Sequence, residues 1–175
     1  MGDIAMAEIL DFLRQLGERY SGSGTLFLLG GSALCLLGNP RRTLDIDYIA
    51  ECPPGEAAEL QAAIESVAAE MKLELEAVPL DEFIPLPDDV DTRHCWVGQF
   101  GGLMVYIYDP YSIALSKVAR GFEADLQDVL FLLRQDLITL EQLETHVAAA
   151  LPRAAQFDIA PAEFRQHLEE IRRLM

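Results

Sequence analysis

The stretch from Phe27 to Tyr48, "FLLGGSALCLLGNPRRTLDIDY", places two adjacent glycines and two aspartates in an otherwise apolar background. Its hydrophobic pattern predicts one buried strand over 25–29 and a second over 43–50. Residues two apart on a strand project from the same face, so Asp45 and Asp47 point to one side. Two carboxylates this close repel each other unless a divalent cation lies between them, and Mg²⁺ suits carboxylate oxygens. We therefore interpret the pair as a metal site.

The turn at Gly30, Gly31 and Ser32 is suited to a phosphate group. Glycine lets the backbone approach an anion without an intervening Cβ, and Ser32 is expected to begin a short helix whose N–H groups favour phosphate. Arg41 and Arg42 precede the second strand and would balance the remaining charge of a triphosphate. A phosphate cradle beside a metal clamp is what metal-assisted phosphoryl or nucleotidyl transfer requires.

The whole chain predicts one domain of mixed structure. Its 175 residues, half of them hydrophobic, suit a single folded domain over 1–175. A front half of strand, helix and strand with a helical tail predicts an α+β domain whose front half is of α/β type. We expect the sheet within 20–109 and a helical part over 110–175. Helices are predicted at 4–20, 33–37, 56–72, 112–134, 140–150 and 161–174, a third strand at 73–79, a surface loop at 79–92, and a hairpin of 94–100 with 103–109.

The net charge limits the classes of partner that the protein is expected to bind. Twenty-nine acidic against thirteen basic side chains leave a formal charge of −16, which repels nucleic acid and anionic membranes over most of the exterior. We expect no membrane or DNA partner, and any polyanion would have to meet a local basic patch. Cys35, Cys52 and Cys95 follow no disulfide or zinc spacing, and no export leader is recognisable, so a cytoplasmic location is expected.

The glycine turn and the aspartate pair together resemble the motif of a known superfamily. Leu29-Gly30-Gly31, thirteen intervening residues and Asp45-Ile46-Asp47-Tyr48 resemble the signature of the DNA polymerase β-like nucleotidyltransferases, in their minimal bacterial branch. The stretch 109–133, "DPYSIALSKVARGFEADLQDVLFLL", is similar to downstream motifs of nucleotidyltransferase-like proteins related to abortive-infection toxins. Together the resemblance spans roughly 25–135.

The resemblance implies a fold and an activity. The fold is a small mixed sheet flanked by helices, with a helical C-terminal part. The activity is transfer of a nucleoside monophosphate from a magnesium-bound nucleoside triphosphate to an RNA or protein hydroxyl, with release of pyrophosphate. A toxin-like role in a toxin–antitoxin pair, with a cognate protein partner, is also implied. The alternative is a catalytically inactive nucleotide-binding or protein-interaction module of the same fold.

The resemblance also implies roles for individual residues. Asp45 and Asp47 would hold the metals, while Gly31 and Ser32 would hold the β- and γ-phosphates. A helix lysine and a later D-x-x-D pair complete the site in the related proteins, and Lys117, Asp125 and Asp128 occupy those positions here. Lys117 would neutralise phosphate charge, and one aspartate would orient it or act as a base.

The third metal carboxylate is left open by the sequence. Asp109, at the end of "VYIYD", is one candidate, and Glu74 and Glu76 compete for the same role. Asp109 also directly precedes Pro110, which is typical of a helix N-cap, and we favour that interpretation.

The arrangement around Lys117 is open as well. On one continuous helix Lys117 and Asp128, eleven residues apart, would share a face. Gly121 could equally end one helix and place Asp125 in the first turn of the next. Asp125 and Asp128 could also be surface acids paired with nearby arginines.

Overall fold

The computed structural model describes residues 2–175 and divides into two compact units. The sheet unit comprises residues 2–78 and Cys95–Tyr108, and the helical unit comprises Pro79–His94 and Asp109–Met175. Across residues 2–175, no helix combines the length and the apolar character needed to cross a membrane.

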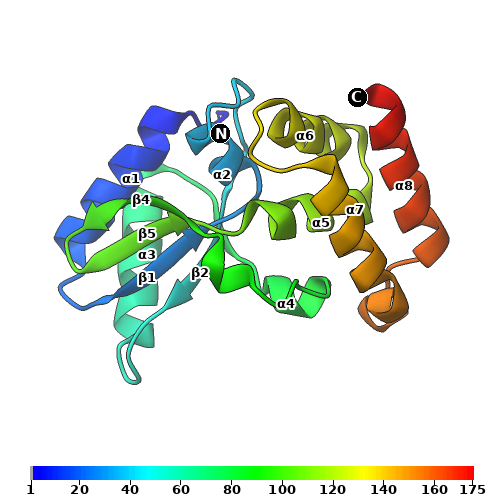
Figure 1. Cartoon of the computed structure of the whole chain (residues 1–175). Coiled ribbons are helices and arrows are strands. Elements are labelled where there is room, and N and C mark those ends of the chain that lie inside the picture. The colour runs from blue at the N-terminus through cyan, green and yellow to red at the C-terminus, as the bar shows by residue number, and fades with distance from the viewer. Residues whose placement is uncertain (1) are drawn as a thin grey trace. The chain divides into compact units, whose positions relative to one another are not determined.

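The sheet unit is built on a mixed sheet, which has five strands in the order β3-β2-β1-β5-β4 among residues 2–175 (Figure 1). β1 runs antiparallel to β2 and parallel to β5, while β3 is parallel to β2 and β4 is antiparallel to β5. The strands are β1 (Gly24–Leu28), β2 (Ile46–Glu51), β3 (Leu75–Ala77), β4 (Cys95–Phe100) and β5 (Leu103–Ile107). With its flanking helices and the helical C-terminal part of the chain, this sheet confirms the predicted α+β class.

Helices α1 (Met6–Arg19) and α3 (Ala57–Met71) cover one face of the sheet and lie behind the strands in Figure 1. Apolar residues of α1 recur at helical spacing, so that Ile9, Phe12, Leu13 and Leu16 form one buried face. They join the α3 residues Leu60, Ala63, Ile64 and Val67 and the strand residues Leu26, Leu28, Ile46, Tyr48, Leu103 and Val105 in one core. The alternate strand residues therefore point to the opposite face.

The stretch from Phe27 to Tyr48 differs slightly from the prediction. Helix α2 spans Gly30–Leu36 and so begins at the first glycine, where a turn was expected. Strand β2 begins at Ile46 because Thr43 instead forms an isolated antiparallel bridge with Ile4. Asp45 therefore lies just before the strand and Asp47 within it.

The helical unit contains four helices of more than ten residues among the described residues. These are α5 (Pro110–Arg120), α6 (Glu123–Arg134), α7 (Leu140–Ala150) and α8 (Pro161–Leu174). A 3₁₀ segment, Leu151–Phe157, joins the last two. Helix α7 begins with a side-chain cap, since the Thr139 hydroxyl accepts a hydrogen bond from the N–H of Gln142.

One prediction for this unit is wrong, and one alternative left open by the sequence is decided. The stretch 79–92 is not only a loop, because α4 (Leu80–Phe83) and a 3₁₀ turn (Val90–Thr92) form where Leu80 and Val90 are buried. Of the two arrangements open for 112–134, the structure has two helices, because Gly121 adopts a φ of 70° and ends α5. A Cβ on Gly121 would overlap the ring of His167, whose Nδ1 lies 2.7 Å from the carbonyl oxygen of Val118.

Candidate active site

The glycine bend lies directly against one of the two aspartates. After β1 the N–H of Leu29 donates to the backbone oxygen of Asp47 at 3.0 Å, which fixes the bend beside β2. Gly30 then turns with a φ of 54°, a left-handed conformation that favours glycine. A Cβ on Gly30 would overlap a carboxylate oxygen of Asp47 and lie 3.1 Å from its Cγ. The backbone and the carboxylate are therefore closer than any other residue type would permit.

Three carboxylates converge beside this bend. Asp45 precedes β2, Asp47 lies on it, and Glu76 pairs with Asp47 across the parallel β2–β3 ladder. One oxygen from each lies within 4.8 Å of the other two, and residues 2–175 contain no other such group of three possible metal ligands. Hard divalent cations prefer this all-oxygen donor set, and a cation would relieve the repulsion among the three charges. Of the candidates for the third carboxylate, Glu76 is the one that the structure groups with Asp45 and Asp47.

Asp109 has a different environment. It caps α5, accepting hydrogen bonds from the N–H groups of Tyr111 at 3.1 Å and Ser112 at 3.2 Å, which confirms the N-cap interpretation. Arg93 donates two further hydrogen bonds to its two carboxylate oxygens, each 2.8 Å long. Both oxygens are thus already held by protein donors. Arg93 was not predicted from the sequence, because it lies sixteen positions before Asp109 and the β4–β5 hairpin between them brings the two together.

The ion pair sets the charge of Asp109. Burial alone would raise the pKa of this carboxyl, but the hydrogen bonds from Arg93 and Ser112 outweigh it and hold the pKa below its usual value. The same pairing raises the pKa of Arg93. The pair therefore stays charged at neutral pH.

Acid should weaken the helical unit through Asp109. The pKa of Asp109 is lower in the folded protein than in the unfolded chain, where a carboxyl has a pKa of about 4. Such a group stabilises the fold above the pKa of the unfolded chain, and this stability is lost as the pH falls through the pKa of the folded protein. We expect the urea midpoint of the wild type to fall more steeply below about pH 4 than that of Asp109→Asn, which has no such proton to gain. The exposed Asp136→Asn serves as the control and should follow the wild type. Parallel curves for the wild type and Asp109→Asn would contradict this expectation.

Lys117 lies in a buried ion cluster with the two predicted aspartates. Its Nζ is 2.8 Å from Asp128 and 3.4 Å from Asp125, and all three residues are at most 3% exposed. Arg120 also donates to Asp125, at 2.5 and 3.1 Å. Asp125 lies in the first turn of α6, so the structure has the broken-helix arrangement around Gly121. Contact of Lys117 with a phosphate stays a prediction.

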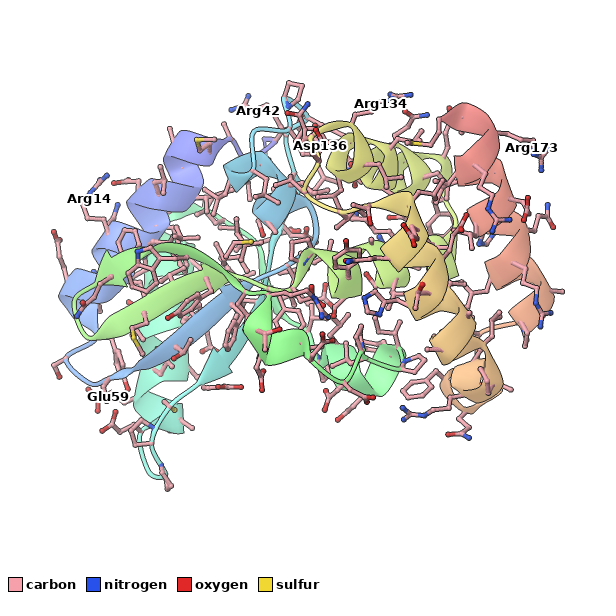
Figure 2. All side chains as sticks on the ribbon, in the orientation of Figure 1. Arg14, Arg42, Glu59, Arg134, Asp136 and Arg173 are labelled. Atoms are coloured by element: carbon pink, nitrogen blue, oxygen red, sulfur yellow. The ribbon has the colours of Figure 1, made fainter. Side chains whose placement is uncertain are left out.

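The remaining predicted residues lie around α2. The hydroxyl of Ser32 is fully buried and donates to the carbonyl of Leu29 at 2.8 Å, so the side chain is used within the bend. Arg41 and Arg42 line a cavity of about 280 Å³ together with the start of α1 and residues 35 and 38–40. Arg42 is on the loop after α2, as Figure 2 shows, and lies 3.3 Å from Glu8. The cavity is at the C-terminal end of α2, whereas the Gly30 bend is at its N-terminal end.

One comparison with known proteins shows the family of the chain. No curated protein and no solved structure matches the chain. A family model described as "Nucleotidyltransferase of unknown function (DUF6036)" matches residues 5–169. This match covers the glycine bend, the three carboxylates and the Lys117 cluster, and the chain therefore belongs to the DUF6036 family of nucleotidyltransferases.

Proposed function

We propose that this chain transfers a nucleoside monophosphate from a magnesium-bound nucleoside triphosphate to a hydroxyl of an RNA or protein acceptor. Membership of a nucleotidyltransferase family supports the general activity. The observation that carries the proposal is the contact of Gly30 with the carboxylate of Asp47, inside a group of three carboxylates. This contact places a backbone that a phosphate can approach next to ligands that a divalent cation prefers.

The three carboxylates fit a divalent cation by their chemistry and their spacing. Asp45, Asp47 and Glu76 would hold it, each through one oxygen. When bound, Mg²⁺ supplies charge neutralisation and Lewis acidity at the phosphates. The backbone of Gly30 and Gly31 would contact the phosphates. Asp125 and Asp128 both accept hydrogen bonds from Lys117, so we assign them to positioning Lys117 and not to proton abstraction.

The proposed reaction is a substitution at phosphorus. The acceptor oxygen forms a bond to the α-phosphorus, and the bond from that phosphorus to the oxygen bridging the β-phosphate breaks. Pyrophosphate leaves with the bonding electrons, and a carboxylate of the group takes the hydroxyl proton.

A transfer assay tests this proposal. The purified protein is incubated with Mg²⁺, a cell lysate and each of the four nucleoside triphosphates labelled at the α-phosphate, and the products are separated into RNA and protein. We expect label in one of the two fractions, pyrophosphate release, and loss of both on chelation of the metal. Absence of label with all four nucleotides would contradict the proposal, and nucleotide binding without transfer would support the inactive module. The toxin-like role stays a prediction, which growth arrest on expression would test.

Gly30→Ala should impair nucleotide transfer more than Gly38→Ala does. Both glycines have positive φ, 54° and 99°, so both substitutions strain the backbone. Only at Gly30 does the new Cβ meet Asp47, whereas nothing lies within 4 Å at Gly38. Because the Asp47 carboxylate must rotate, we expect a loss of roughly ten- to a hundredfold in transfer rate for Gly30→Ala, the range seen when a metal ligand loses its orientation. Equal rates for the two variants would show that the contact with Asp47 does not matter.

A further inference from the structure

The face of the sheet opposite α1 and α3 is the surface of interest, here called the open sheet face. Strand pairing places Trp96 beside Tyr106, Tyr106 beside Phe27, and Asp47 beside Glu76. Paired residues project to the same side, and none of these belongs to the core beneath the two helices. Met104 shares this side because it lies two residues from Tyr106 on β5. Glu51 shares it because it lies four residues from Asp47 on β2.

One half of the open sheet face is aromatic. The rings of Trp96 and Tyr106 meet edge to face, with 5.1 Å between their centroids. The ring of Phe27 stacks on that of Tyr106, with 5.9 Å between the centroids. Trp96 is 55% exposed and Met104 is 45% exposed. Adjoining exposed apolar side chains of this size mark surfaces that bind a partner.

The other half of the open sheet face is acidic. Glu51 and Glu76 are exposed, and within residues 2–175 neither forms an ion pair. Of the described arginines of the sheet unit, Arg14 and Arg19 are instead paired with Asp11 and Glu70 on its helices. The acidic half therefore attracts cations, and it includes the carboxylates proposed to hold the metal.

We infer that the acceptor is a basic segment of a protein, bound across the open sheet face. A lysine or arginine of the segment would lie over Trp96, the ring with the strongest attraction for cations, and others would pair with Glu51. A serine, threonine or tyrosine of the same segment would then reach the α-phosphate at the carboxylate group. This inference rests on the proposed function and names the acceptor class for that site.

RNA fits this surface less well. Single-stranded nucleic acids bind where aromatic side chains accompany positive charge, which neutralises the phosphate backbone. Here the aromatic side chains accompany carboxylates, on a chain with a net charge of −16. The charge of the face thus favours a basic protein over RNA.

The single tryptophan of the chain makes the inference directly testable, because Trp96 fluorescence reports on the open sheet face alone. The probes are two synthetic peptides of equal length that both contain Ser, Thr and Tyr, one flanked by Lys and Arg and the other by Asp and Glu, together with bulk tRNA. We expect only the basic peptide to change the Trp96 emission. We also expect it to accept at least about tenfold more label than the acidic peptide or tRNA, because these two probes can form neither the cation–π contact nor the ion pair.

Variants locate the binding. Trp96→Ala and Glu51→Gln should each raise the KM for the basic peptide about tenfold, the size of a desolvated cation–π contact or a charge-assisted hydrogen bond. Phe122→Ala removes an aromatic side chain that is 68% exposed in the helical unit and should leave the KM unchanged.

Nucleotide binding, measured separately by calorimetry, distinguishes the two possible failures. Preferred labelling of tRNA or of the acidic peptide would overturn the inference and leave the proposed function standing. The same holds if nucleotides bind but the basic peptide at millimolar concentration changes neither emission nor label. Absence of nucleotide binding would instead contradict the proposed function, and the Trp96 titration would still decide whether the face binds a basic segment.

Discussion

Asp45→Asn combined with Asp47→Asn should lower the rate of nucleotide transfer by about a thousandfold, at the upper end of the loss seen when one preorganised electrostatic group is removed. Asparagine keeps the shape of aspartate but removes the charge, so only Glu76 of the three converging carboxylates would still be ionised. A single carboxylate does not retain a divalent cation against water as three do. The measurement is the initial rate of label transfer under saturating Mg²⁺.

Glu74→Gln is the matched control for this variant. Glu74 is an exposed carboxylate just before β3, two residues from Glu76, and lies outside the group of three. It should change the rate by less than about twofold, because exposed charges outside the site are largely screened. A double variant that keeps more than about a tenth of the wild-type rate would show that the aspartates do not hold a catalytic cation.

Lys117→Met should destabilise the protein by about 3–5 kcal/mol, the cost of removing one partner of a buried ion pair. The substitution leaves Asp128 buried with no cation from Lys117, and leaves Asp125 with Arg120 as its remaining cation. Urea unfolding followed by circular dichroism measures the loss. Arg120→Met should cost less, because the Arg120 side chain is 61% exposed to screening by water and because Lys117 remains as a second cation beside the buried Asp125.

A second substitution separates charge from packing in this cluster. Lys117→Met with Asp128→Asn removes both charges and should lose less stability than the sum of the two single variants. Equal stability losses for Lys117→Met and Arg120→Met would contradict a buried cluster. If Lys117→Met instead abolished transfer without loss of stability, the predicted phosphate contact would be supported.

The parts of the site that lie close in the sequence could be predicted from it. The spacing of Asp45 and Asp47, and the glycine bend one short helix upstream, follow from local periodicity and from the backbone freedom of glycine. The structure places Gly30 against Asp47. The starts of α7 and α8 also follow from local sequence, because Thr139 caps the first and Pro161 is the first residue of the second.

The parts that depend on pairing between distant segments could not be predicted. Alternation in the third strand puts Glu74 and Glu76 on one face, but only the parallel register with β2 selects Glu76 as the neighbour of Asp47. The ion pair of Asp109 with Arg93 likewise depends on how the hairpin returns the chain. The sequence around Gly121 allowed either one continuous helix or two helices. The structure has two, and Gly121 packs against the ring of His167, which is distant in the sequence.

Manganese binding followed by electron paramagnetic resonance tests the central claim most directly, because free Mn²⁺ gives a signal that is lost on binding. The wild type and the variant Asp45→Asn, Asp47→Asn, Glu76→Gln are titrated with Mn²⁺ in the presence of non-hydrolysable analogues of the four nucleoside triphosphates. We predict that, with at least one analogue, the wild type and the analogue together bind more Mn²⁺ than the analogue binds without protein. The variant should add nothing to the Mn²⁺ bound by the analogue. Equal binding by the two proteins, or no binding by the wild type, would contradict the account.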